Sequence, residues 1–161
     1  MAARFAGLGL AVALFAAPLA WAAGEDSGYE WMTDHGDGDA WLVYGSPETG
    51  EDYIFSLSCP GNAKATGMTV YVDIPGTKVG DPVVIAFSAG SAKLSIRGKI
   101  ATDAMSGFLF AEAAGFKIKP VIAALRGTGP ITVNTGDVVT TLPEARRGKA
   151  VSEFAKSCAL D

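Results

Sequence analysis

The chain has 161 residues, with 13 basic and 17 acidic side chains, a formal net charge of −4 and 49% hydrophobic residues. This acidic balance excludes a general nucleic-acid binder, because phosphate recognition needs clustered lysine and arginine side chains. The length is ample for one hydrophobic core, so we expect a single domain.

Residues 1–22 have the pattern of a secretory signal peptide. Arg4 gives a positive start, an apolar run follows from Phe5 to Ala17, and Ala20-Trp21-Ala22 is a small-x-small cleavage site. A membrane anchor is the alternative, but Pro18 interrupts a run that is already shorter than the ~20 residues of a membrane span. We therefore expect a periplasmic or secreted protein that keeps no stable membrane anchor after cleavage.

We predict that the exported protein begins at Ala23 or at an adjacent residue, because signal peptidase cuts directly after the small-x-small motif. Intact-mass measurement of the exported protein checks this. Recovery of a chain that still carries Met1 from the envelope fraction would contradict the assignment.

Residues 23–40 are acidic and rich in glycine, and their apolar side chains are limited to a few positions such as Tyr29, Trp31 and Met32. A stretch of this composition buries too little apolar area to offset the entropy of ordering it. The sequence therefore predicts a flexible leader over 23–40, with a short edge strand at Tyr29–Met32 as its one ordered part. The single β-rich domain would follow at residues 41–161.

The stretch from Tyr53 to Cys59 alternates between large apolar residues and smaller or polar ones. This period of two is typical of a strand with one buried face. The run Trp41–Tyr44 precedes it across a turn-rich segment at residues 45–50, which predicts a β-hairpin.

Further apolar runs, several of them alternating and all separated by turn residues, occupy much of the remaining chain, at residues 68–74, 83–87, 94–99, 108–110, 131–133 and 138–142. Regularly spaced short strands predict a mainly β fold, an antiparallel β-sandwich or barrel. A short helix is expected at Pro120–Leu125, and Pro143-Glu144 is expected to open a final helix.

The chain has two cysteines, Cys59 and Cys158. Cys59 is the last inward position of the Tyr53–Cys59 strand. Cys158 shares one face of the final helix with Val151, Phe154 and Ala155. Both cysteines therefore point toward the core, and in an exported chain this predicts a disulfide that ties the helix to the strand. Two free buried thiols are the alternative.

A wider pattern of residues resembles a group of small exported proteobacterial proteins of unassigned function. It consists of Trp41-x-x-Tyr44-Gly45-x-Pro47-x-Thr49, Phe55-x-Leu57-x-Cys59, Leu142-Pro143 and Phe154-x-x-x-Cys158. The general plan is also similar to VasI-like secretion accessories and invasion-associated locus B proteins. The resemblance implies a signal peptide followed by a disulfide-bearing β-domain, and it carries no catalytic residues over to this chain.

Candidate chemistry is sparse. His35, the one histidine, lies in the acidic leader, where it has no expected partner for general base catalysis. Asp34, Asp37 and Asp39 lack the remaining ligands of a calcium loop, and zinc would need a second histidine or spare cysteines. We therefore expect no catalytic residues, no metal, no cofactor and no enzyme activity.

Two groups of side chains suit recognition of a partner: the aromatic pair Trp41 and Tyr44, and the basic pair Arg146 and Arg147. The sequence favours a non-catalytic periplasmic or secreted module that binds a protein or an envelope component. The alternative is an inhibitor of an envelope-active enzyme such as a lysozyme, in which a loop such as Ser88–Ser91 enters the active site.

Overall fold

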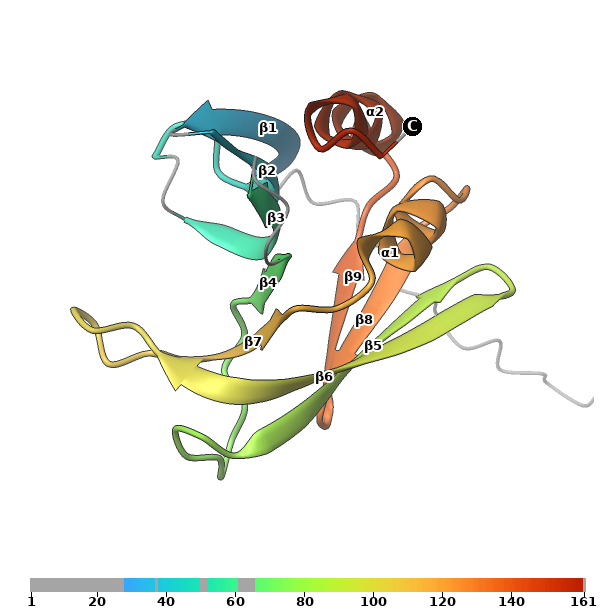
Figure 1. The fold of residues 1–161 in the computed structure, drawn as a ribbon. Helices are drawn as coiled ribbons and strands as arrows, with labels where there is room; N and C mark the ends of the chain where they lie inside the picture. The colour runs from blue at the N-terminus through green and yellow to red at the C-terminus, as the bar shows by residue number, and fades with distance from the viewer. Residues whose placement is uncertain (1–27, 37, 50–51, 61–65, 161) are drawn as a thin grey trace, which may run out of the picture.

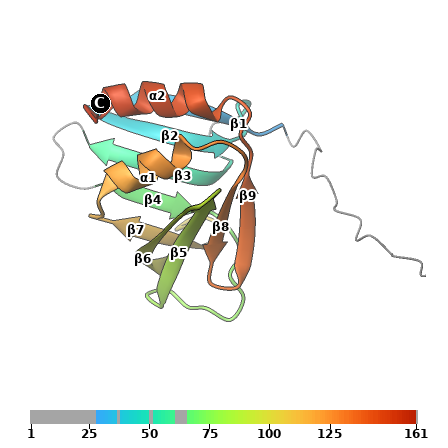
Figure 2. The same ribbon diagram turned by 90° about the vertical axis from the view of Figure 1, so that its right-hand side faces the viewer.

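The computed structural model describes residues 28–36, 38–49, 52–60 and 66–160. In these ranges nine strands form one antiparallel sheet in the order β1-β2-β3-β4-β7-β6-β5-β8-β9. The sheet curls into a half-barrel, and α1 and α2 lie inside the curl (Figures 1 and 2). The prediction of a mainly β, antiparallel fold is confirmed, with one curled sheet in place of two packed layers.

The strands and helices have the following bounds. They are β1 (Glu30–Gly36), β2 (Asp39–Gly45), β3 (Tyr53–Pro60), β4 (Gly67–Val70), β5 (Pro82–Ala89), β6 (Ala92–Thr102), β7 (Leu109–Ala114), α1 (Ile118–Leu125), β8 (Ile131–Thr135), β9 (Val138–Leu142) and α2 (Arg147–Ser157).

The β3 strand has the alternation that its sequence predicts. Phe55, Leu57 and Cys59 are buried, and Ser56 and Ser58 between them are partly exposed on the opposite face. The predicted hairpin with β2 is also confirmed, since Leu42 pairs with Leu57 and Tyr44 with Phe55. These cross-strand pairs place large apolar side chains next to each other on the inner face.

The corner of the half-barrel lies in β6, the longest strand. Its first part, from Ala92 to Lys99, pairs with β5, whereas its last part, from Lys99 to Thr102, pairs with β7. Gly98 lies at this change of partner, and a Cβ atom there would overlap the backbone oxygen of Glu112. Glycine is therefore required where the two strands come this close.

The two helices fill the inside of the curl. α1 contacts β5 and β6, while α2 contacts β1, β2 and α1. Val151, Phe154 and Ala155 of α2 are fully buried, as the helical spacing predicts. The core therefore lies between the inner face of the sheet and the two helices (Figure 2).

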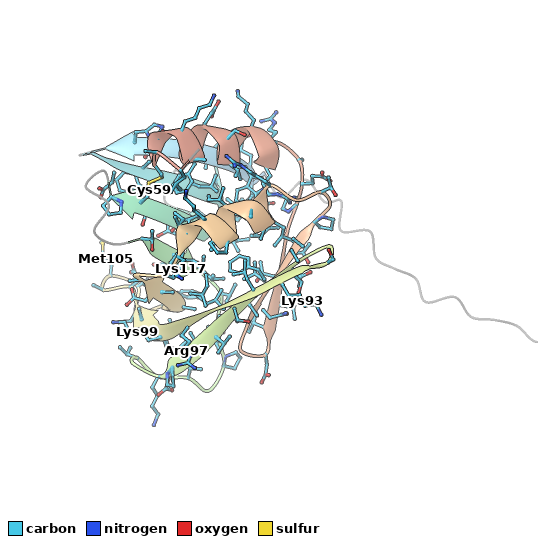
Figure 3. All side chains as sticks on the ribbon, turned by 45° about the vertical axis from the view of Figure 1, so that its right-hand side comes forward. Cys59, Lys93, Arg97, Lys99, Met105 and Lys117 are labelled. Carbon is cyan, nitrogen blue, oxygen red and sulfur yellow. A yellow bond between two sulfur atoms is a disulfide. The ribbon has the colours of Figure 1, made fainter. Side chains whose placement is uncertain are left out.

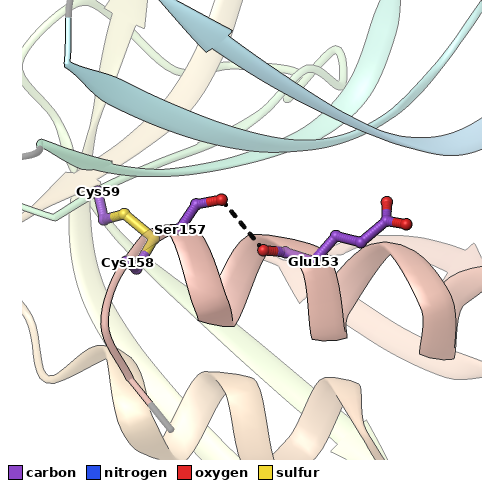
Figure 4. Close-up of a disulfide and its surroundings, with 4 residues drawn as sticks. All are labelled: Cys59, Glu153, Ser157 and Cys158. Carbon is purple, nitrogen blue, oxygen red and sulfur yellow. Dashed lines mark hydrogen bonds between the residues drawn. A yellow bond between two sulfur atoms is a disulfide. The ribbon is translucent and has the colours of Figure 1, made fainter.

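The predicted disulfide joins Cys59 of β3 to Cys158, the residue that caps the C-terminus of α2 (Figure 4). The two Cα atoms are 6.0 Å apart, a separation typical of disulfides. The bond fastens the end of α2 to the strand around which the sheet is built.

The short edge strand predicted at Tyr29–Met32 is confirmed from Glu30 to Met32, but the flexible leader predicted around it is wrong from Thr33 onward, because β1 continues to Gly36 and pairs with β2 along its whole length. Trp31 is buried, and its indole N–H donates to the carbonyl oxygen of Pro143 at 2.9 Å. This contact with a residue 112 positions later supplies the burial that the local composition does not suggest. The signal peptide predicted at residues 1–22 lies outside the described residues.

Several element boundaries also differ from the sequence prediction. The first helix begins at Ile118, and Pro120 lies in its first turn, where a missing N–H costs no hydrogen bond. The final helix begins at Arg147 and not at Pro143, because Arg146 adopts a left-handed backbone conformation with φ 61°. The strand predicted at 68–74 ends at Val70.

Candidate functional site

Two of the four residues predicted to contact a partner lie inside the domain. Tyr44 is 7% exposed and Arg147 is 1% exposed. Arg146 is on the surface and pairs with Glu30. Trp41 is half-buried on the face of the sheet that is turned away from the helices. The structure therefore removes Tyr44 and Arg147 from the candidate contact surface and leaves Trp41 and Arg146.

The residues weighed for catalysis and metal binding do not gather. His35 lies on β1 opposite Ala40 and is exposed, and its backbone N–H donates to Oδ1 of Asp34 at 2.7 Å. No group of three His, Cys, Asp or Glu side chains that could hold a metal occurs in the described ranges, which leave out Asp37. Both cysteines are joined to each other.

A cavity of about 780 Å³ lies on the outer face of the sheet, the face turned away from α1 and α2. Its size falls within the range of about 300–1,000 Å³ that is usual for ligand sites. We call it the outer groove. It is lined by Asp34, Trp41, Val43, Tyr53, Ser56, Ser58, Gly67, Met68, Thr69, Arg97, Gly98, Lys99, Glu112, Ala113 and Ala114.

The strand register explains why a hollow forms here. Two rows of outward positions cross the sheet side by side. One row is Asp34, Trp41, Ser58, Gly67 and Ala114, and the other is Met32, Val43, Ser56, Thr69, Glu112 and Lys99. The central strands β3, β4 and β7 contribute mostly small side chains, while the flanking strands contribute large ones. The small residues form a floor, and the large ones form two walls.

The floor of the groove carries three side-chain hydroxyl groups. Ser56 lies opposite Thr69 in the register, and Ser58 is two residues further along β3. Within the part of the chain that the structure describes, none of these three side-chain hydroxyls takes part in a hydrogen bond. All three residues are partly exposed, so their donors and acceptors face solvent in the groove.

The two walls differ in chemistry. On one wall, the indole ring of Trp41 lies over Gly36, where an added Cβ would be 3.6 Å from Cζ3 of the ring. On the other wall, Lys99 forms a salt bridge of 3.0 Å with Glu112, whereas Arg97 has no ion pair among the described residues. Figure 3 shows Arg97 and Lys99 near each other on β6, with Lys93 toward the opposite end of that strand. The groove thus has one aromatic wall and one basic wall with a free guanidinium.

A stack of aromatic rings lies beside the groove. Tyr71 is stacked between Phe110 and Phe108, with ring centroids 4.5 Å and 5.5 Å away, and its edge meets Tyr53 of the groove at 5.1 Å. Burial and then the Asp103 carboxylate raise the pKa of both tyrosines. Both phenols therefore stay protonated at neutral pH, and the stack lies beside the groove at Tyr53.

The groove was not identified from the sequence, although one signal for it exists. Ser56, Ser58, Thr69, Arg97 and Lys99 all fall at the outward positions of their alternating strands. What the sequence does not give is the order of the strands. β4 pairs with β7 and not with β5, and this crossover brings Arg97 and Thr69 to one site.

Comparisons of the chain with protein-family models, with curated proteins and with solved structures found no match. Among the described residues, no helix has the length and apolar character needed to cross a membrane.

Proposed function

We propose that this protein is a non-catalytic binding module that works outside the cytoplasm and recognises a component of the cell envelope through the outer groove. The observation that carries the proposal is the floor of unused hydroxyls at Ser56, Ser58 and Thr69 between an aromatic and a basic wall. Polar groups that converge in a preformed hollow are the usual signature of a ligand site. The disulfide is compatible with an oxidising compartment such as the periplasm.

The carboxylates of the groove support binding over turnover. Asp34 on β1 and Glu112 on β7 are separated by four strand spacings, which is about 19 Å along the sheet. A pair of carboxylates that hydrolyses a glycoside works at roughly 5–9.5 Å. Glu112 also forms a salt bridge with Lys99. These two acids are therefore too far apart to act together on one bond.

The inhibitor alternative remains a second proposal with less support. The segment Ser88–Ser91 contains only the two-residue turn Gly90-Ser91 between β5 and β6. Ala89, which precedes the turn, is buried. Little of this segment projects far enough to enter an active site, so the outer groove is the stronger candidate.

We predict that a photo-reactive residue in the groove captures a partner in intact cells. p-Benzoylphenylalanine at Val43, which lines the groove, should give a cross-linked adduct of discrete size after irradiation. The matched control is the same residue at Val139, which is 64% exposed on the distant edge strand β9, and it should give none. Electrophoresis and mass spectrometry of the adducts check this. Equal adducts from both positions, or none from Val43, would contradict the proposed function.

A further inference from the structure

The outer groove has a chemistry that narrows its ligand, given the proposed function on which this inference rests. Among the residues that the structure describes, the three floor hydroxyls of Ser56, Ser58 and Thr69 have no hydrogen-bond partner. Hydroxyl groups both donate and accept hydrogen bonds. A ligand that fits them carries many groups of the same kind, spaced over an extended surface. Sugars have this property, since each ring presents several hydroxyls.

The aromatic wall suits one face of a sugar ring. Gly36 has no side chain, and the six-membered ring of Trp41 occupies the space above it. The indole ring therefore packs against the backbone of β1 at Gly36, and it also lines the groove. Aromatic rings present a flat apolar surface, which matches the C–H face of a pyranose ring.

The basic wall favours a ligand that carries a negative charge at that side of the groove. Lys99 is paired with Glu112 at 3.0 Å, so its charge is compensated. Arg97 is exposed and is without an ion pair in the ranges that the structure describes. A guanidinium binds a carboxylate through two parallel hydrogen bonds. The groove therefore fits a ligand whose carboxylate lies near Arg97 and whose neutral part lies toward Trp41 and Asp34.

An extended acidic peptide fits less well, because it needs main-chain partners. Peptides that bind β-sheets usually add to an exposed edge strand, where backbone N–H and C=O groups are free. The floor strands β3, β4 and β7 are central in the sheet and pair on both sides. Their backbone groups are engaged in the ladders, and only side-chain hydroxyls remain.

The length of the groove favours a chain of sugars over a single ring. From Trp41 on β2 to Arg97 on β6 there are four strand spacings, which is about 19 Å. We propose that the outer groove binds an oligosaccharide that carries carboxylate groups, with a ring against Trp41, ring hydroxyls on Ser56, Ser58 and Thr69, and a carboxylate on Arg97. Two sources share this chemistry, namely uronic acids and amino sugars with a lactyl ether.

Calorimetric titration of the whole exported protein at low salt tests the ligand class. The probes are a hyaluronan oligosaccharide, in which glucuronic acid alternates with a neutral ring, a glycan that contains N-acetylmuramic acid, neutral maltopentaose and pentaglutamate. We expect saturable binding of at least one of the two acidic glycans, about tenfold or more tighter than binding of maltopentaose or pentaglutamate. Which acidic glycan binds more tightly distinguishes the two sources. Added salt should weaken the binding, because the Arg97 contact is exposed to screening.

Variants locate the contacts. Arg97→Gln should lower affinity for the acidic glycan about 10- to 100-fold, whereas Lys93→Gln, on the same strand outside the groove, should change it less than about twofold. Thr69→Val should lower it about two- to tenfold without loss of stability, since its hydroxyl bonds to nothing in the described structure. Trp41→Ala should abolish most of the binding, and Trp41→Phe should restore part of it.

The outcomes separate this inference from the proposed function. If pentaglutamate binds as tightly as the acidic glycans, the groove recognises acidic peptides and the saccharide inference is wrong. If no glycan binds but the Val43 adduct forms in cells, the ligand class is wrong and the binding function stands. If Arg97→Gln and Lys93→Gln have equal effects, the carboxylate does not lie on Arg97 and the inference is overturned.

Discussion

Replacing Arg147 with methionine should lower the free energy of unfolding by about 3–5 kcal/mol, because several buried carbonyl oxygens lose a charged donor and each one left without a partner costs about 1–3 kcal/mol. The side chain is 1% exposed, yet it carries a full charge. Burial lowers the pKa of Arg147, and the nearby Glu144 carboxylate opposes that shift. The guanidinium stays charged because its pKa is far above neutral.

The cost arises because the guanidinium serves several backbone segments at once. Its Nε donates to the carbonyl oxygen of Leu125 at 2.8 Å, its Nη1 to Pro143 at 3.1 Å, and its Nη2 to Gly127 at 2.5 Å and Gly129 at 2.8 Å. The positive charge also lies at the C-terminus of α1, where the helix dipole favours a cation. Methionine fills a similar volume but leaves these carbonyl oxygens without a donor.

The neighbouring arginine supplies the control for this experiment. Arg146 is exposed and makes a surface ion pair with Glu30, so Arg146→Met should cost less than about 1 kcal/mol. Arg147→Lys should recover only part of the loss, because an ammonium group cannot reproduce the planar fork. Urea unfolding followed by circular dichroism measures all three variants. Equal losses for Arg146→Met and Arg147→Met would show that the buried network contributes nothing special.

Arg147 also shows what sequence reasoning missed and could have found. The run Arg146-Arg147-Gly148-Lys149 has the composition of a solvated surface. However, Arg147 is four residues before Val151 and seven before Phe154, so it lies on the buried face of the same helix. The same applies to Tyr44, which shares the inward parity of Leu42 in β2. In both cases the periodicity was the better guide than the residue type.

The alternation of apolar residues along the sequence correctly predicted the elements whose buried face it defines. The alternation of Tyr53–Cys59, its hairpin with β2 and the apolar face of α2 all follow from periodicity, and the disulfide follows from two of them. The edge strand β1 was predicted only as far as Met32, because its continuation to Gly36 depends on pairing with β2 and on contact with α2, where the Thr33 hydroxyl donates to Glu153, 120 positions away. Composition alone does not contain that contact.

The outer groove is less predictable for the same reason. Its walls come from β2 and β6, which become parts of one site only through the pairing of β4 with β7. Gly98 permits the close approach of β6 to β7 at the corner. Such non-local pairings are set by the packing of the whole sheet. A sequence gives the outward residues of each strand, but not which strands lie side by side.

Arg147 holds the start of α2 and the disulfide holds its end. Loss of the disulfide should therefore destabilise the domain. Cys158→Ser should lower the free energy of unfolding by about 2–5 kcal/mol, because the bond closes a long loop and so restricts the unfolded chain. The two cysteines are 99 positions apart in sequence. The native contacts of α2 remain in the variant, since Val151, Phe154 and Ala155 stay buried against the sheet.

Because the bond acts mainly on the unfolded chain, the variant should fold to the same structure and unfold at lower urea with a slope that is equal or steeper. Ser157→Ala is the matched control, since it removes one exposed hydrogen bond of 3.2 Å to the carbonyl oxygen of Glu153 in the same turn (Figure 4), and it should cost less than about 0.5 kcal/mol. The double variant Cys59→Ala, Cys158→Ser should lie within about 1 kcal/mol of the single variant Cys158→Ser in its free energy of unfolding, because both substitutions break the same disulfide. If Cys158→Ser unfolds within about 0.5 kcal/mol of the parent protein, the disulfide does not stabilise the domain, and the packing of α2 alone holds it against β1 and β2.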